Sequence, residues 1–187
     1  MNNKKLYNLA NISEIISGYS FREAIVENKN SKVFIVQAKD TKNNLHISEK
    51  DLREIENLSY GEKSAKDGDV IMSNKGFFSS TVIKSKAKII PSSSVYIIRP
   101  NQEKILSEYL AIYLNSRAGQ IEIKKYESGG GIKIIPLKDL GNVKVMIPEI
   151  ERQKIIIDLY KNIERQNKIL ERKKIINQNI LEAIFIK

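Results

Sequence analysis

Residues 148–187 carry the sequence PEIERQKIIIDLYKNIERQNKILERKKIINQNILEAIFIK. After Pro148 this segment contains neither Pro nor Gly, the two residues that most strongly interrupt a helix. A Pro-Glu start is typical of a helix N-terminus. We therefore predict one long helix, which would reach about 58 Å at about 1.5 Å per residue. A globule formed by residues 1–147 has a radius of only about 15 Å, so the helix must extend beyond it.

The apolar residues of this helix recur in alternating steps of three and four, the spacing of a coiled coil. The predicted seam consists of Ile156, Leu159, Ile163, Gln166, Leu170, Lys173, Asn177, Ile180 and Ile184. Its polar members can fix the alignment of two helices at some expense of stability. Five apolar residues beside the seam widen the stripe: Ile155, Ile169, Ile175, Ile176 and Leu181. We predict packing in a small bundle or against a partner; the alternative is a helix folded back on its own domain.

The composition indicates a globular chain. Of its 187 residues, 41% are hydrophobic and 29% are charged, which is enough apolar content for a core. No apolar run approaches about eighteen residues, so we expect no membrane span and a cytoplasmic location. The absence of Cys excludes disulfides, thiolate zinc sites and thiol nucleophiles. The single histidine, His46, is expected at the surface, and we predict no metal site.

The formal net charge of +10 favours a polyanionic partner, and the charge is unevenly distributed. Residues 70–102 contain five basic residues and no acidic one, whereas residues 40–69 contain eight acidic residues against five basic ones. The basic residues of the 70–102 segment, which we call the basic window, are Lys75, Lys84, Lys86, Lys88 and Arg99. We therefore predict a basic surface formed by the middle of the chain.

The residues before Pro148 predict an α+β globule. Short runs rich in β-forming residues predict strands at 33–38, 70–73, 81–83, 87–90, 95–98, 132–135 and 143–147. Turn sequences between the middle runs favour a meander.

Helical spacing predicts helices at 103–115 and 120–126, with the break at 116–119, and a single helical turn at 136–140. Residues 51–58 are expected to form a short helix or turn. The predicted organisation is a globular domain over residues 1–147 and a helix over residues 148–187.

Six stretches, taken in order, resemble a known family. They are residues 9–18 (LANISEIISG), 68–71 (GDVI), 109–116 (YLAIYLNS), 129–133 (GGGIK), 137–148 (LKDLGNVKVMIP) and 151–156 (ERQKII). Their order and spacing, rather than any one of them, are similar to the DNA specificity subunit of Type I restriction-modification systems. More narrowly, the chain resembles one half of that subunit, a target-recognition domain followed by its spacer helix.

The resemblance implies a non-catalytic reader of double-stranded DNA sequence. The usual family member has two recognition domains and two spacer helices, which pack antiparallel and separate the two halves of a bipartite site. This chain has one of each, so we expect a half-subunit that forms a homodimer through its helix; the alternative is a truncated or separately encoded piece. The resemblance implies modification (methyltransferase) and restriction subunits as partners. It places S-adenosylmethionine, ATP and Mg²⁺ on those partners and no cofactor on this chain.

Two loops are candidate DNA contacts. Lys75, Gly76, Phe77 and Ser79 form a turn that combines glycine, a small hydroxyl, a cation and aromatics, and such a loop can approach a groove closely. We expect one of the two phenylalanines in this turn to belong to the core. Gly130 and Lys133 belong to a triple-glycine stretch whose backbone can approach a ligand. That stretch lacks the Lys-Ser or Lys-Thr and the spacing of a P-loop, so ATP binding is not predicted. For each loop, an ordinary turn away from DNA is the alternative.

A third candidate is the alternation of Lys84, Lys86 and Lys88, which predicts a ladder of cations on one face of a strand facing the phosphate backbone. The alternative is a solvated edge that discourages strand pairing. Other functions remain open at this point: a freestanding dimeric DNA-binding regulator, an antirestriction or scaffolding coiled coil, or a metal-dependent nuclease. The acids available to a nuclease are scattered: Asp40, Glu49, Asp67 and Asp69.

Overall fold

The computed structural model describes residues 5–28, 30–42, 44–57 and 63–185. In chain order the elements are β1 (Lys5–Asn8), η1 (Leu9–Asn11), β2 (Ser13–Ser17), β3 (Val33–Val36), η2 (Ala38–Thr41), β4 (His46–Ile47), η3 (Glu49–Asp51), β5 (Arg53–Ile55), β6 (Val70–Ser73), β7 (Ser80–Ile83), β8 (Lys88–Pro91), β9 (Val95–Pro100), α1 (Ser107–Asn115), α2 (Arg117–Lys124), α3 (Leu137–Leu140), β10 (Lys144–Ile147) and α4 (Ile150–Phe185). The predicted α+β class is confirmed.

The strands form three sheets. The largest has the order β2-β9-β6-β7-β4 and is mixed, because β4 pairs parallel with β7 while the other pairs are antiparallel. A second sheet has the order β5-β3-β8, and β1 pairs antiparallel with β10. The predicted meander is therefore wrong at β8, which leaves its chain neighbours and pairs parallel with β3. Pairing with a strand about fifty residues earlier in the chain is a tertiary choice that local sequence does not encode.

The five-stranded sheet is buried on both faces. Along β6, Val70 and Met72 pack into one core with α1, and Ile71 packs into a second core on the opposite face. Strand β9 divides in the same way, with Ile98 on the α1 side and Ile97 on the other. A strand covered on both faces reads as a continuous apolar run, which is why these segments were recognisable from sequence.

Two short segments differ from the prediction. Residues 53–55 were expected in a helix or turn, but they form β5, which pairs antiparallel with the edge of β3. Residues 132–135 were expected to form a closing strand, but only isolated bridges occur there, at Ile134. In both places the available neighbour, rather than the propensity of three or four residues, determines the conformation.

The break between α1 and α2 also differs from the prediction. Ser116 ends α1 and begins α2, because its hydroxyl accepts the N–H of Gly119 at 3.2 Å as an N-cap. Gly119 therefore lies inside α2 and not at a helix stop. A Cβ at this position would lie 2.1 Å from the Tyr113 carbonyl oxygen, so glycine here permits the close contact between the two helices.

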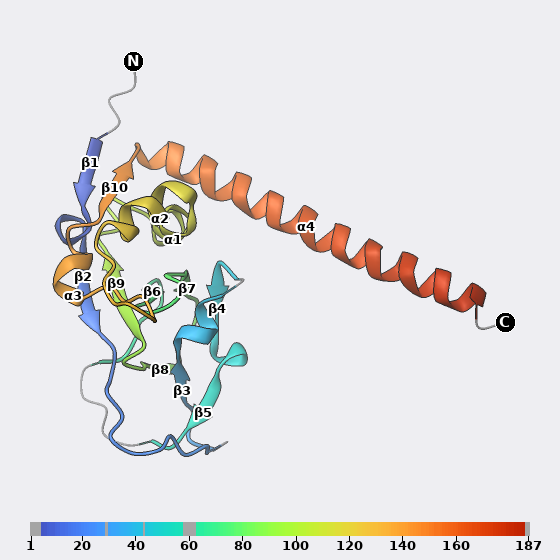
Figure 1. The fold of residues 1–187 in the computed structure, drawn as a ribbon, viewed down its shortest axis with the longest axis horizontal. Helices are drawn as coiled ribbons and strands as arrows, with labels where there is room; N and C mark the ends of the chain where they lie inside the picture. The colour runs from blue at the N-terminus through green and yellow to red at the C-terminus, as the bar shows by residue number, and fades with distance from the viewer. Residues whose placement is uncertain (1–4, 29, 43, 58–62, 186–187) are drawn as a thin grey trace.

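Helix α4 is one continuous helix of 36 residues, as predicted. Figure 1 shows it leaving the globule beside β10 and projecting far beyond it. Only its first turns are fixed to the globule, and its two fully buried residues are Gln153 and Ile157. Among the described residues, no helix has the length and apolar content required to cross a membrane.

Candidate nucleic-acid interface

The turn at residues 74–79 joins β6 to β7 and presents one of its two aromatic rings to solvent. Phe77 is 74% exposed, whereas Phe78 is 4% exposed and packs in the core below α1, as the sequence predicted for one of the pair. Gly76 has a φ of +71°, a conformation that side chains other than hydrogen disfavour. The buried Phe78 therefore holds a turn whose outer residues, Lys75 and Phe77, face solvent.

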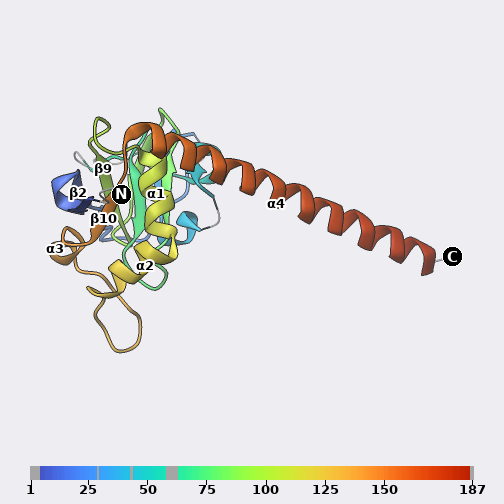
Figure 2. The ribbon, with the colours of Figure 1, turned by 90° about the horizontal axis from the view of Figure 1, so that it is seen from above.

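The triple-glycine stretch lies against this turn. The Gly76 N–H donates to the Lys133 carbonyl at 2.8 Å, and the Ile135 N–H donates to the Asn74 carbonyl at 3.1 Å. Residues 128–134 form a narrow hairpin closed by two hydrogen bonds between Ser128 and Ile134. In Figure 2 this hairpin projects from the globule beyond α2. The structure thus brings together two loops that are more than fifty residues apart in the sequence.

A third segment, which sequence reasoning missed, contacts the turn at residues 74–79. The Thr41 hydroxyl donates to the Ala38 carbonyl at 2.8 Å, so the 2.7 Å contact between Thr41 and Ser79 must use the hydrogen of Ser79. The next residue, Lys42, places its Nζ 4.7 Å from the centroid of the Phe77 ring. Residue 42 lies in an acid-rich part of the sequence, and no local pattern could have indicated this contact.

We refer to residues 41–42, 74–79 and 128–134 together as the loop surface. It contains three lysines and no acidic residue, and its exposed apolar side chains include Phe77 and Ile132. Gly130 is exposed there, with open space around the position of a Cβ. Lysines around apolar tips are suited to phosphate and base contacts on nucleic acid.

Lys84 and Lys86 lie elsewhere. They follow β7 in the connection to β8, at the opposite end of the β6–β7 hairpin from the turn at 74–79. Lys88 begins β8 in the other sheet, so the predicted ladder along one strand is wrong. Lys84 and Lys86 are exposed, and their contact with DNA stays a prediction.

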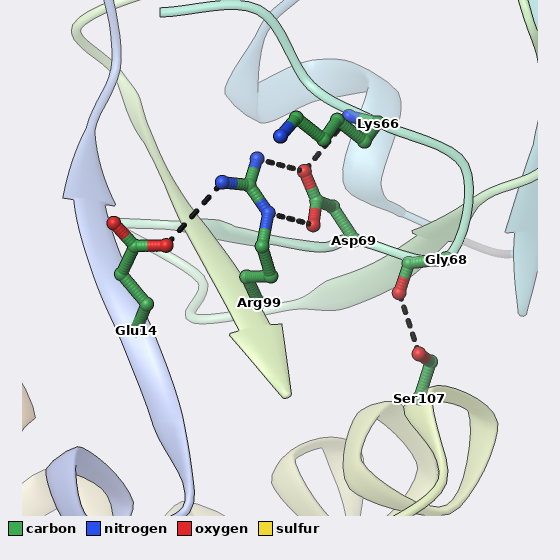
Figure 3. Close-up of polar contacts among 6 residues, drawn as sticks. All are labelled: Glu14, Lys66, Gly68, Asp69, Arg99 and Ser107. Carbon is green, nitrogen blue, oxygen red and sulfur yellow. Dashed lines mark hydrogen bonds and ion pairs between the residues drawn. The ribbon is translucent and has the colours of Figure 1, made fainter. Parts of the chain in front are cut away.

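Arg99, counted among the cations of the basic window, is committed to carboxylates (Figure 3). Its Nε and Nη2 each lie 2.9 Å from an oxygen of buried Asp69, and Nη1 lies 3.3 Å from Glu14. The hydrogen bond with Asp69 raises the pKa of Arg99 further above its ordinary value. Asp69 also accepts the Lys66 N–H at 2.8 Å. This cluster holds the turn at residues 66–69 in place.

The acidic residues considered for a nuclease site form hydrogen bonds in different parts of the fold. Asp40 accepts the Gln37 N–H at 2.8 Å, and Asp67 accepts the Ser85 N–H at 3.1 Å. Within the described ranges, no three His, Cys, Asp or Glu side chains are grouped so that they could hold a metal ion.

Helix α4 presents different faces to the globule and to solvent. Leu159 follows buried Ile157 by two residues, which rotates it by about 200° around the helix axis. The apolar seam residues that follow are between 47% and 63% exposed: Leu159, Ile163, Leu170, Ile180 and Ile184. Gln166, Lys173 and Asn177 are exposed with them. Ile156 differs, because it is half-buried against the core, so the exposed seam begins at Leu159.

A charged contact fixes the next turn of α4. Glu108 on α1 lies 2.7 Å from His46 Nε2 and 3.1 Å from Lys161 Nζ, which joins β4, α1 and α4. His46, expected at the surface, is thus half-buried and hydrogen-bonded to Glu108. Burial alone would raise the pKa of Glu108, but the hydrogen bonds from Lys161 and His46 outweigh it and hold that pKa below its ordinary value.

A polar hollow of about 330 Å³ lies between the base of the loop surface and α4. Its lining is Thr41, Asn44, Ser79, Asn115, Tyr160 and Glu164. The Glu164 carboxylate disfavours a phosphate in this hollow, and Asn115 is already engaged in two hydrogen bonds with the backbone of Ser80. The exposed loop surface is therefore a better candidate for a nucleic-acid interface than the hollow.

Comparison with solved structures shows the same fold in three chains. The first chain comes from a structure that concerns complex assembly and conformational transition of the type I R-M system. It has a TM-score of 0.76 and 22% sequence identity, and the match covers 98% of this chain and 44% of that one. The HsdS subunit from Thermoanaerobacter tengcongensis has a TM-score of 0.66 and 23% sequence identity, and the match covers 92% of this chain and 40% of that one. The type I restriction-modification S subunit from M. genitalium has a TM-score of 0.59 and 11% sequence identity, and the match covers 91% of this chain and 42% of that one. This chain therefore spans less than half the length of each. Comparison with curated proteins gave no match.

A family model, described as the Type I restriction modification DNA specificity domain, matches residues 1–178. That range contains the loop surface, the buried Gln153 and most of the exposed seam of α4. The order of short motifs noted in the sequence is thus accompanied by the matching fold. The chain belongs to the Type I restriction modification DNA specificity domain family.

Proposed function

We propose that this chain is the sequence-specific DNA-recognition component of a Type I restriction-modification system. In this proposal it acts as a half-subunit: the globule reads one half of a bipartite double-stranded site, and α4 pairs with α4 of a second copy. The chain itself is non-catalytic and directs modification and restriction subunits to the site.

One observation carries the DNA-binding part of the proposal: three separate segments converge on an exposed, acid-free surface of lysines and apolar tips. Lys75 and Lys133 come from loops 58 residues apart, yet their loops are joined by the hydrogen bond from Gly76 to Lys133. Rigid attachment to the core through Phe78 favours a defined reading surface over a flexible basic tail. Family membership supports the same conclusion.

The exposed seam supports self-association. Apolar side chains recur on α4 from Leu159 to Ile184, on a side of the helix rotated away from the globule. A stripe of this size marks an interaction site. A 36-residue helix spans about 54 Å at about 1.5 Å per residue, which corresponds to at most about 16 base pairs of duplex. Two copies paired through this helix would place two globules at separated positions on one DNA molecule.

In this proposal the catalytic reactions take place on other chains. Adenine methylation with S-adenosylmethionine and ATP-driven, Mg²⁺-dependent cleavage would be performed by the modification and restriction subunits. The contribution of this chain is to bind DNA and to position those subunits at the site. Such an assembly acts on intracellular DNA, so we propose a cytoplasmic location.

A methylation map tests the proposal. Adenine methylation would be mapped across the genome in cells that carry the cognate modification subunit, with and without this chain. We expect a bipartite palindromic motif only when this chain is present, because two identical halves read identical half-sites. An asymmetric motif would replace the homodimer with a pair of different halves, and no motif would contradict the proposal as a whole.

A freestanding regulator is distinguished by a second measurement. The purified chain alone would be titrated onto the mapped site and onto a scrambled duplex. A specificity half is expected to bind weakly without its modification subunit and to gain sequence preference when that subunit is added. Tight, selective binding by the chain alone would instead favour the regulator.

A further inference from the structure

The contact between Lys42 and Phe77 is the most specific feature of the loop surface. The Lys42 ammonium lies 4.7 Å from the centre of the ring, within the range of a cation–π interaction. The ring is 74% exposed, although burying a Phe side chain is favourable. An aromatic ring held at a tip, with a cation over one face, is a surface suited to a ligand that has both apolar and anionic parts.

Three contacts hold this pair in place. Phe78 is buried in the core next to Phe77, and the Ser79 hydroxyl is bonded to Thr41, the residue before Lys42. On the other side, the Gly76 N–H donates to the Lys133 carbonyl. The ring and the ammonium are thus attached to the fold through adjacent residues on both segments. A preorganised pair of this kind loses little conformational freedom when it binds.

Duplex DNA offers one strongly apolar group on its base edges, the 5-methyl group of thymine, in the major groove. The phosphates that border the groove are the anionic groups within reach of a neighbouring lysine. We infer that Phe77 and Lys42 act as one specificity-determining unit, in which the Phe77 ring contacts a thymine methyl and Lys42 binds a phosphate beside it. This inference rests on the proposed function and adds to it the identity of a base that the chain reads.

The position of Lys42 argues against insertion of the ring between base pairs. Side chains that wedge into a base step place their faces against the stacked bases and bind from the minor groove. In this structure one face of the Phe77 ring is already occupied by the Lys42 ammonium. Insertion would require that contact to break, whereas edge contact with a methyl group in the major groove leaves it intact.

The test uses the chain together with its modification subunit and the site defined by the methylation map. Each thymine of that site would be replaced in turn by deoxyuridine, which removes only the 5-methyl group. We expect at least one replacement to lower the affinity of the wild-type complex roughly four-fold, the effect of burying one methyl group. In Phe77→Ala the same replacement should have no effect, since the ring that senses the methyl group is gone.

Lys42→Ala is expected to act differently. It should weaken binding to the mapped site and to a scrambled duplex by the same factor, and lower the slope of log affinity against log salt by about one. Two matched variants serve as controls: Val26→Ala removes an exposed apolar side chain outside the loop surface, and Lys50→Ala removes an exposed lysine from η3. Neither control should change the effect of deoxyuridine or the salt slope.

Three outcomes would overturn the inference. They are a wild-type complex indifferent to every deoxyuridine replacement, a Phe77→Ala complex with an unchanged deoxyuridine penalty, and a fluorescence increase of 2-aminopurine, placed away from the methylated adenine, that Phe77→Ala abolishes. Because a methyltransferase flips its target adenine, only an increase that depends on Phe77 reports insertion of the ring. If the map itself shows no motif, the proposed function fails. If the map shows a clear motif but no deoxyuridine replacement lowers the affinity, only the inference about Phe77 and Lys42 is overturned, and the proposed function stands.

Discussion

Leu106 donates its backbone N–H to the side-chain oxygen of Gln153 at 2.8 Å, and this bond joins the N-terminus of α1 to the first turn of α4. The Gln153 amide nitrogen donates in turn to the carbonyls of Lys104 at 3.0 Å and Pro148 at 2.9 Å. The side chain is fully buried, and its oxygen and both amide hydrogens are used. Gln153 therefore fixes the direction in which the long helix leaves the globule.

Replacing Gln153 by Leu should lower the free energy of unfolding by about 3 kcal/mol, because one buried N–H and two carbonyls lose their partner. Urea denaturation at fixed protein concentration would measure the loss, with Gln178→Leu, on the exposed part of α4, as control. The control should change stability by no more than about 0.5 kcal/mol. Equal stability of both variants would show that the anchor contributes nothing to the fold.

The seam can be disrupted without touching the globule. Leu159→Lys combined with Ile163→Lys places two charges on the exposed apolar side of α4, and we expect self-association to be lost while the globule stays folded. Light scattering after gel filtration would report the mass, and circular dichroism the fold. Asn167→Lys with Gln178→Lys adds the same charge on another side of the helix and should leave association intact. A seam variant that remains dimeric would contradict the assignment.

Removing the lysines of the two joined loops should weaken DNA binding. For Lys75→Ala with Lys133→Ala, we expect the slope of log affinity against log salt to fall by about 1.8, since each phosphate contact contributes about 0.9. Lys84→Ala with Lys86→Ala removes the same charge from the far end of the β6–β7 hairpin, and we expect a smaller change. If the two double variants lower the salt slope equally, the DNA interface would have to include both ends of the β6–β7 hairpin.

The contact of Glu108 with His46 and Lys161 gives the fold a pH dependence at acidic pH. The Glu108 pKa is lower in the folded chain than its ordinary value of 4.5, so the carboxylate stabilises the fold fully above pH 4.5. That stabilisation is lost as the pH falls through the folded pKa. Glu108→Gln should therefore cost on the order of 1 kcal/mol at pH 7 and less at pH 3.5. Urea denaturation at both pH values measures this difference, and exposed Glu103→Gln is the control. A Glu108→Gln cost that does not vary with pH would exclude the contact.

Replacement by alanine should destabilise the fold at Gly119 but not at Gly130. In Gly119→Ala the added Cβ would lie 2.1 Å from the Tyr113 carbonyl oxygen, so α1 and α2 must separate and we expect a loss of about 3 kcal/mol. In Gly130→Ala the new methyl group meets open space, and stability should not change measurably. Thermal unfolding would compare the two variants. A tolerated alanine at position 119 would mean that the helices pack less closely than described.

Local sequence determined the elements that have strong patterns of their own. The long helix follows from nearly forty residues without Gly or Pro after Pro148, and the buried strands from their continuous apolar runs. Tyr109 and Tyr113, four residues apart and therefore on the same face of α1, are both buried. Burial raises the pKa of Tyr109 to about 12, and its hydroxyl donates to the Met146 carbonyl of β10 at 2.7 Å. The ordered motifs were sufficient to identify the family.

Tertiary structure decided everything that depends on pairing between distant segments. Strand β8 joins β3 and not its chain neighbours, and Lys84 and Lys86 fall at the far end of the hairpin from Lys75. The Lys42–Phe77 contact exists only because Thr41 and Ser79 are brought together across 38 residues. Such contacts are selected by the free energy of the whole core, in which the burial of remote side chains outweighs local propensity. For that reason the sequence alone predicted the loops at 74–79 and 128–134 as candidates, and only the fold showed that residues 41–42 join them in one surface.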